Sequence, residues 1–358
     1  MLRGAAGLVL GGFILFGAMA GAAGPPKETP PEQSFKGEIS VSLSTIVVRV
    51  VDTWGRPVLG LKPEDFRVRV GKTEVPVVAL DWISSSEEAA PAAPPETPPE
   101  VVETAPEEAA PPPPPRARLV VFFVQADLNP TRISGQLRMR PYTRELLGTL
   151  HPGDRVAVVS FDSHLKLWQD FTADREATQA VLARAMLYSP EEEVPPAEPL
   201  SLARHFDFAA ARRAASPERA LELTARALEP LPGEKTVIFL GWGLGRYGGD
   251  GVHMTPDYKP AVQALGDAHA TVFVLDVTSA DYHSLEVGLE GVADATGGVY
   301  LKTFRFPGLA TETLAQTISG YYILTLDQDA LAGQSGEVRI DLREKKKGTV
   351  LARQLAVR

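Results

Sequence analysis

The sequence of 358 residues contains no cysteine. This absence excludes disulfides, thiolate zinc sites, iron–sulfur clusters, cysteine nucleophiles and lipid anchors on cysteine. An excess of basic residues is also lacking, because 36 Lys and Arg stand against 45 Asp and Glu, for a net charge of −9. Nucleic-acid binding needs a dense basic surface, so this balance argues against it. No H-E-x-x-H, no paired histidine spacing and no G-x-S-x-G elbow occurs, and catalysis therefore has no candidate constellation.

Residues 1–23 have the pattern of a secretory signal peptide. One basic side chain, Arg3, precedes the uncharged stretch Ala5–Gly24, and small residues at Ala18-Met19-Ala20 and Gly21-Ala22-Ala23 provide two cleavage sites. We therefore expect an exported protein, located in the periplasm or outside the cell. An uncleaved membrane anchor is the alternative, since twenty apolar residues just reach the length that spans a bilayer.

Two segments have the composition of linkers. Residues 24–35 form a Pro-rich spacer, and residues 84–116 form a Pro/Glu-rich linker with eleven prolines, seven glutamates and no basic residue between Ser86 and Pro115. Such a segment cannot bury a core and is expected to be an extended, solvated spacer. Without its seven charges the net charge falls from −9 to −2, so the acidity belongs to the linker. A shorter run, Ser189–Pro199, is expected to be a long loop.

Three blocks of predicted structure surround the main linker. Residues 36–83 are an N-terminal, immunoglobulin-like β region, and residues 321–358 are a C-terminal β extension. In residues 117–320, strand and helix patterns alternate, and Leu119–Val124 is the continuous apolar run of a strand buried on both faces. The other strands expected in this block are Arg155–Phe161, Leu165–Trp168, Thr236–Leu240, Thr271–Leu275 and Val299–Leu301. The expected helices are Thr131–Leu150, Asp174–Met186, Leu200–Leu228, Tyr258–Ala268 and Ser284–Ala295.

This alternation predicts an α/β fold with a doubly wound, mostly parallel sheet of Rossmann-like topology. We expect the N- and C-terminal strands to form one small β-sandwich, into which the α/β domain is inserted. Two separate β appendages are the alternative, but small sheets with open edges have little stability of their own.

Several segments occur in a specific order and spacing: Val50–Phe66, Leu119–Asn129, His151–Val158, Leu275–Val277, Ala293–Gly298 and Ser319–Leu324. In these segments the chain resembles the bacterial secreted proteins with a von Willebrand factor A-related domain. The resemblance covers most of the mature chain and implies an A-type (von Willebrand factor A-like) fold for residues 117–320.

In ligand-binding A-type domains, the resemblance implies a metal-ion-dependent adhesion site with Asp-x-Ser-x-Ser after the first strand, a Thr on a second loop and an Asp after the fourth strand. Its oxygens hold Mg²⁺, which accepts an acidic residue of the partner. Here the first motif falls on Gln125-Ala-Asp127-Leu-Asn129, Gly241-Trp242-Gly243 supplies no acid, and Glu191–Leu202 contains no Thr. Two oxygen ligands do not make a magnesium site, so we expect no metal or other cofactor. If a divalent cation does bind, Asp127 and Asn129 are its candidate ligands.

The sequence therefore favours an exported, non-enzymatic binding or assembly protein with a degraded adhesion site and a protein partner. Ligands of open parallel sheets collect at the carboxyl edge, so we expect the partner on the loops Gln125–Ile133, Gly241–Val252 and Asp276–His283. The candidate partner-binding residues are Gln125, Asp127, Asn129, Trp242 and Asp276. Trp242 is either an anchor that faces the partner or a core residue.

Two alternatives stay open. Gly243–Gly248 fits the dinucleotide fingerprint G-x-G-x-x-G, which would indicate a nucleotide- or cofactor-binding enzyme. That fingerprint has to open a helix, whereas the next helix is expected only after Pro256, so a flexible loop is the interpretation we favour. The second alternative is a scaffold that acts through its β-sandwich and linker.

Overall fold

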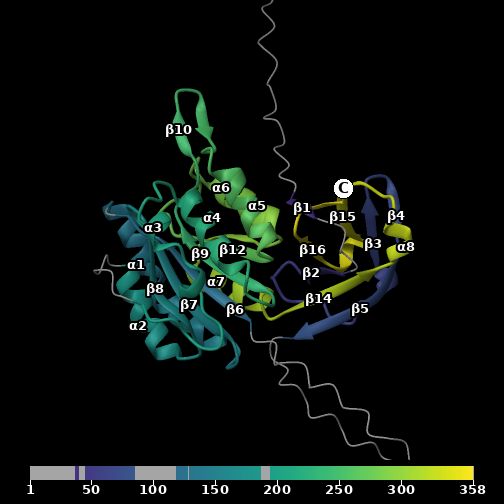
Figure 1. Ribbon diagram of the computed structural model, residues 1–358, viewed down its shortest axis with the longest axis horizontal. Helices are drawn as coiled ribbons and strands as arrows, with labels where there is room; N and C mark the ends of the chain where they lie inside the picture. Colours follow the sequence, from purple (N-terminus) through teal and green to yellow (C-terminus); the bar gives the residue numbers. More distant parts are fainter. Residues whose placement is uncertain (1–36, 40–44, 85–117, 128, 187–193, 358) are drawn as a thin grey trace, which may run out of the picture. The chain divides into compact units, whose positions relative to one another are not determined.

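The computed structural model describes residues 37–39, 45–84, 118–127, 129–186 and 194–357 (Figure 1). The expected signal peptide (1–23), the spacer (24–35) and, apart from Ser84, the linker (84–116) lie outside these ranges, and so does part of the expected loop Ser189–Pro199. Within the described ranges, no helix is long and apolar enough to cross a membrane.

A six-stranded sheet with the order β13-β12-β9-β6-β7-β8 is the centre of the α/β domain (Figure 1). Its strands are β6 (Leu119–Gln125), β7 (Arg155–Phe161), β8 (Leu165–Thr172), β9 (Lys235–Gly241), β12 (Ala270–Asp276) and β13 (Tyr300–Lys302). Neighbouring strands are parallel except for β7 and β8, which are antiparallel. An order that runs outward from a central strand in both directions is doubly wound. The predicted α/β fold with a mostly parallel sheet is confirmed.

Helices cover both faces of this sheet because its central strand is apolar on both sides. Every side chain of β6 is buried. Alternate residues from Leu119 onward pack with one set of helices, and those from Val120 onward pack with another. The first set contains α4 (Pro217–Leu228), α5 (Tyr258–Asp267) and α6 (Glu286–Thr296), and the second contains α1 (Pro130–Thr149), α2 (Arg175–Ala185) and α7 (Pro307–Thr317).

The predicted joint β-sandwich is also present. One sheet has the order β16-β2-β14-β5 and the other has the order β1-β17-β15-β3-β4, and the two share one hydrophobic core. The N-terminal strands are β1 (Gly37–Ile39), β2 (Thr45–Val51), β3 (Phe66–Val70), β4 (Thr73–Val75) and β5 (Val77–Ser84). The C-terminal strands are β14 (Gly320–Leu326), β15 (Gly336–Leu342), β16 (Thr349–Ala352) and β17 (Leu355–Val357). In each sheet, N-terminal and C-terminal strands are direct neighbours, so both ends of the chain build the sandwich.

Two helical predictions need correction. The expected helix Leu200–Leu228 is broken into a 3-10 turn, the short helix α3 (Phe208–Ala211) and α4. The Ser216 hydroxyl accepts a hydrogen bond from the Arg219 N–H, and Pro217 follows it, so these residues begin a new helix. Helix α7 was not expected, because its eleven residues show only a weak apolar stripe.

Two glycines of α1 provide a matched test of the packing between this helix and the loop after β12. A Cβ atom at Gly135 would lie 1.8 Å from the Val277 carbonyl oxygen, whereas one at Gly148 would meet nothing within 4 Å. Gly135→Ala is therefore expected to destabilise the protein by about 1–3 kcal/mol, as an overpacked contact does. Gly148→Ala should stabilise it by up to about 1 kcal/mol, because alanine favours the helix. Urea unfolding of both variants checks the opposite signs; equal effects would contradict this packing.

Candidate functional site at the carboxyl edge of the sheet

Gln125, the last residue of β6, joins two neighbouring strands. Its side chain is fully buried. The amide Nε2 donates to the Gly243 carbonyl oxygen over 2.8 Å, and Oε1 accepts from the Trp242 N–H over 2.9 Å. The amide therefore satisfies the backbone of the loop after β9. The prediction that Gln125 faces a partner is wrong, because no part of it reaches the surface.

Asp127 and Asn129 lie near the surface, and both have local partners. The Asp127 carboxylate accepts from the Asn129 N–H over 2.9 Å and forms an ion pair with the Arg132 guanidinium. The Asn129 side chain caps α1 by accepting from the Thr131 N–H over 3.0 Å. The Arg132 guanidinium also lies over the Trp242 ring, 3.3 Å from its centroid. The Arg132 guanidinium is thus already paired with the Asp127 carboxylate, which was the strongest candidate metal ligand.

Trp242 has properties of both of its predicted roles. Its side chain is partly buried and packs against the core cluster that contains Val124 and Leu240. Its indole Nε1 is buried without a hydrogen-bond partner. One face of the Trp242 ring contacts Arg132 at the carboxyl edge, while the side chain also packs on the core, so Trp242 connects the two.

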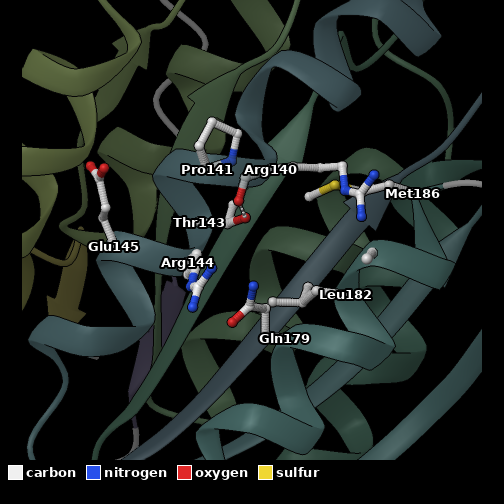
Figure 2. Close-up of a pocket in the computed structure, with 9 residues that line it drawn as sticks. Arg140, Pro141, Thr143, Arg144, Glu145, Gln179, Leu182 and Met186 are labelled. Atoms are coloured by element: carbon white, nitrogen blue, oxygen red, sulfur yellow. Dashed lines mark hydrogen bonds between the residues drawn. The ribbon is translucent and has the colours of Figure 1, made fainter.

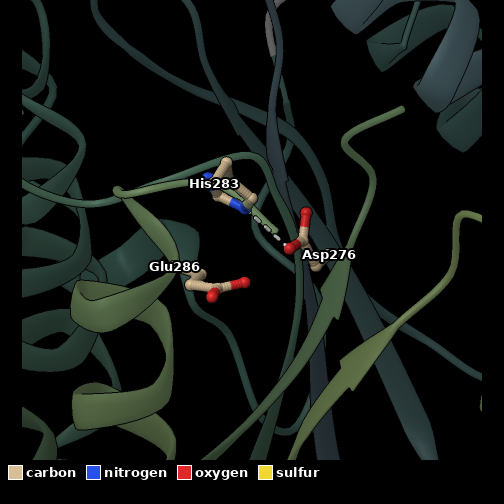
Figure 3. A group of neighbouring side chains, drawn as sticks. All are labelled: Asp276, His283 and Glu286. Atoms are coloured by element: carbon tan, nitrogen blue, oxygen red, sulfur yellow. Dashed lines mark hydrogen bonds and ion pairs between the residues drawn. The ribbon is translucent and has the colours of Figure 1, made fainter. Parts of the chain in front are cut away.

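Asp276, at the end of β12, is the centre of a second cluster (Figure 3). The side chain is only 2% exposed, so this residue does not face a partner directly and that prediction is wrong. Its Oδ2 accepts from His283 Nε2 over 2.8 Å and from the Tyr300 hydroxyl, and its Oδ1 accepts from the Thr278 N–H over 2.9 Å. Figure 3 shows His283 on the following loop and Glu286 in the first turn of α6, both turned toward the carboxylate.

Hydrogen bonds keep the Asp276 carboxylate of this cluster ionised at neutral pH. Burial alone would raise the pKa of Asp276, but the hydrogen bonds from His283, Tyr300 and the Thr278 N–H outweigh it and lower that pKa. Burial and the bond to Asp276 raise the pKa of Tyr300, which stays a neutral donor. Glu286 forms an ion pair with Lys302 over 2.9 Å. Asp276 is thus ionised, and both carboxylates already have donors.

Asp276, His283 and Glu286 are also residue types that bind metal ions. One ligand atom each from Asp276, His283 and Glu286 lies within 4.8 Å of the others, which is a suitable spacing for one cation. However, Tyr300 donates to both carboxylates, and Lys302 supplies a positive charge at Glu286. A cation would have to displace both donors. The arrangement therefore fits a hydrogen-bond network that orders the loop between β12 and α6.

Exposed aromatic side chains gather at the same edge. We call Trp242, Tyr247, Tyr282, Phe304 and Phe306 the aromatic edge; all of them follow the carboxyl ends of β9, β12 or β13. Tyr247, Tyr282, Phe304 and Phe306 are between 37% and 81% exposed. Cations lie on several rings: Lys302 Nζ is 4.1 Å from the Tyr282 centroid, and the Arg138 guanidinium is 5.6 Å from that of Phe304. The edge therefore combines aromatic rings with positive charge.

The glycine-rich segment Gly243–Gly248, expected to be a flexible loop, is a loop only over Gly243–Gly245. Its last residues are β10 (Arg246–Gly248), which pairs with β11 (Gly251–His253) in a hairpin that extends away from the sheet (Figure 1). The next helix, α5, begins only at Tyr258. The glycines do not open a helix, which is the geometry that the dinucleotide fingerprint requires.

A further hollow lies between α1 and α2 (Figure 2). It is open to solvent and is lined by Arg140, Thr143, Arg144, Glu145 and Gln179, with Leu182 and Met186 at its base. None of the sequence-predicted site residues lines it. It is a seam between two helices rather than part of the edge.

Sequence reasoning missed His283, Glu286, Tyr300 and Lys302, because the cluster is assembled from a loop, a helix and the next strand. It also missed Phe304 and Phe306. The signal was present in the run Phe304-Arg305-Phe306-Pro307, where two aromatic residues flank a cation just before a helix begins.

Comparisons with known proteins give structural likeness only. No protein-family model and no curated protein matches the sequence. BatB from Bacteroides thetaiotaomicron, a conserved hypothetical protein, is 14% identical over 57% of this chain and 97% of its own, with a TM-score of 0.37. A von Willebrand factor type A protein from Catenulispora acidiphila is 13% identical over 67% of this chain and 66% of its own, with a TM-score of 0.40. Proximal thread matrix protein 1 of the mussel byssus, with a zinc-occupied MIDAS motif, is 14% identical over 56% and 47%, with a TM-score of 0.35.

Asp276→Asn tests the second cluster through its pH dependence. Because the folded-state pKa of Asp276 is lowered, its contribution is fully present above the ordinary pKa of about 3.9 and is lost as the pH falls through the folded value. The variant should be about 1–3 kcal/mol less stable at pH 5, because charge-assisted hydrogen bonds are lost. That difference should shrink toward pH 3 in urea unfolding.

Asp281→Asn is the control, since Asp281 forms a solvent-exposed ion pair with Arg305. It should cost less than about 1 kcal/mol. A stability difference for Asp276→Asn that is the same at pH 5 and pH 3 would contradict an ionised, stabilising Asp276.

Proposed function

We propose that the protein is an exported, non-enzymatic binding protein, and that its α/β domain is of the A type and engages a protein partner through the aromatic edge. The carrying observation is the distribution of exposed apolar side chains. Of eleven large apolar side chains exposed in the described part of the chain, six follow the carboxyl ends of three adjacent strands. These six are Tyr247, Tyr282, Val287, Phe304, Phe306 and Leu309.

The composition of this edge supports a protein partner over a small ligand. Binding energy at protein interfaces is concentrated in Trp, Tyr and Arg side chains. The edge offers Trp242 under Arg132, Tyr282 beside Lys302, and Phe304 beside Arg138. Paired rings and cations present apolar faces beside guanidinium and ammonium N–H donors, so a partner segment with apolar and acidic residues fits this surface.

Recognition without a metal ion is part of the proposal. In an adhesion site, Mg²⁺ would provide the positive charge that meets the partner's acid. Here the Arg132 guanidinium pairs with and neutralises Asp127, and a guanidinium has five N–H donors, more than this pair uses. An arginine can accept a carboxylate with two parallel hydrogen bonds, so the acid of a partner needs no cation to bridge it.

Two features argue against the enzyme alternative. Gly243–Gly248 lies in a loop and hairpin rather than at the start of a helix, and the cluster at Asp276 is occupied by its own hydrogen bonds. The scaffold alternative is separated from edge binding by the following experiment.

Removing exposed rings from the aromatic edge should weaken partner binding. With Tyr282→Ala and Phe306→Ala together, the complex should weaken by at least about tenfold, because a hot-spot side chain contributes about 2 kcal/mol or more. The matched control is Trp54→Ala with Leu59→Ala, which removes two similarly exposed apolar side chains from the sandwich region. The measurement is photo-crosslinking from position 309 in native cells, followed by the affinity of the purified partner for each variant.

Thermal unfolding verifies that both double variants fold. If both bind equally well and binding disappears on deletion of residues 86–115, the linker carries the interaction and the scaffold alternative is correct.

Divalent cations should leave thermal unfolding unchanged. Millimolar Mg²⁺, Mn²⁺ or Ca²⁺ should give the same midpoint as a chelator, since Arg132 occupies Asp127. A cation bound only to the native state at a hundred times its dissociation constant would add about 2.7 kcal/mol, which is readily measured. A rise with a cation that Asp127→Ala abolishes would make the edge a metal-dependent adhesion site.

A further inference from the structure

A cavity of about 320 Å³ lies at the amino ends of β9 and β12, at the opposite edge of the sheet from the aromatic edge. Glu234 and His269, which directly precede these two strands, line it together with Thr271. The sandwich contributes Arg49 from β2 and Arg353 from the segment after β16. Its volume is in the range of small-molecule sites.

Three buried polar atoms of this lining have no hydrogen-bond partner: Arg49 Nε, Arg353 Nε and Glu234 Oε2. Arg49 is the most enclosed of these residues, with 4% exposure; its Nη1 donates to the Thr271 hydroxyl over 3.4 Å and its guanidinium lies over the Phe273 and Tyr321 rings. A buried polar atom without a hydrogen bond costs about 1–3 kcal/mol, and native proteins satisfy nearly all such atoms. Two donors and one acceptor in one cavity therefore call for a complementary molecule.

The charges of the lining define that molecule. Burial lowers the pKa of Arg49 to about 10, so it is protonated at neutral pH. Burial and the nearby Arg353 lower the pKa of His269, whose Nδ1 is 3.1 Å from Arg353 Nη1, so the imidazole is neutral and accepts. Burial raises the pKa of Glu234, against the lowering effect of Arg353 and Arg49. With Glu234 ionised, the two arginines and this glutamate leave one net positive charge, which a single anion neutralises.

Four aliphatic residues also line the cavity, beside Thr45, Thr296 and Gly297. Ile46, Val47, Leu351 and Leu355 supply aliphatic walls. They leave room for a hydrocarbon body beside the charged groups, since the cavity is several times larger than one carboxylate. An inorganic anion would leave these walls without contacts.

We infer that this cavity binds a small aliphatic carboxylate that also carries a neutral hydrogen-bond donor, such as a hydroxy acid. The carboxylate accepts from Arg49 Nε and Arg353 Nε, the hydroxyl donates to Glu234 Oε2, and the alkyl chain packs on the aliphatic walls. Each of the three unpartnered atoms then has a partner, and the lining becomes neutral.

Three compounds with the same six-carbon skeleton test this inference: 2-hydroxyhexanoate, hexanoate and norleucine. Calorimetry on the full mature chain at pH 7 and constant ionic strength should show saturable, one-site binding of 2-hydroxyhexanoate. Hexanoate should bind at least about tenfold more weakly, because it leaves the charged Glu234 without a hydrogen-bond donor. Norleucine should also bind more weakly, because its ammonium restores the uncompensated charge. No saturable binding by any compound, or norleucine as the tightest ligand, would overturn the inference.

Variants assign the binding to this cavity. Arg353→Gln should weaken 2-hydroxyhexanoate by about tenfold or more, and Glu234→Ala should remove its advantage over hexanoate. Both residues are partly exposed, so the fold should persist, and thermal unfolding verifies this. Leu351→Phe should block binding by filling the cavity. Arg339→Gln, at an exposed arginine of β15, is the matched control and should bind normally. Unchanged affinity in Arg353→Gln and Leu351→Phe would place the ligand elsewhere.

Discussion

The burial of β6 on both faces is the constraint on which the rest of the structure depends. A strand without a polar face has to be covered by helices on two sides, and parallel neighbours then require crossover connections over those faces. Several connections consequently meet at each of the two ends of the strands, the carboxyl edge and the amino edge of the sheet. The loops after β6, β9, β12 and β13 converge at the carboxyl edge, and the segments before β9 and β12 converge at the amino edge. Both the aromatic edge and the charged cavity are consequences of this arrangement.

At the carboxyl edge, side chains of the chain itself order the loops after β6 and β9. Gln125 satisfies the backbone at Trp242 and Gly243, and Arg132 neutralises Asp127 while covering the indole ring. An uncompensated carboxylate at this place would favour a cation, whereas an ion-paired one does not. The amide of Gln125 and the Arg132–Asp127 ion pair therefore hold the loops of this edge from within the chain.

Local patterns predicted the elements well but not the contacts between them. The apolar run Leu119–Val124 predicts its strand from its own sequence. The joint sandwich was predicted because neither set of strands is stable alone. Three features escaped prediction: the burial of Gln125, the hairpin at Arg246–His253 and the network around Asp276. Each depends on which distant backbone or side chain lies opposite, and a single sequence does not state this. From the sequence alone, the Gln125 amide at the end of its strand could equally have been exposed.

The charged cavity depends on the insertion of one domain into the other. Arg49 comes from the N-terminal strands, Arg353 from the C-terminal ones, and Glu234 and His269 from the inserted sheet. Tight packing fixes this junction: a Cβ atom at Gly297 would lie 2.7 Å from the Arg353 backbone nitrogen, and the Gln354 N–H donates to the Ala295 carbonyl oxygen over 3.0 Å. If stability alone determined the junction, apolar residues would serve better than a buried Arg49 and the half-buried Arg353 and Glu234. Charges at this place are better explained by a ligand that completes them, and such a ligand would strengthen the junction because it binds only the assembled state.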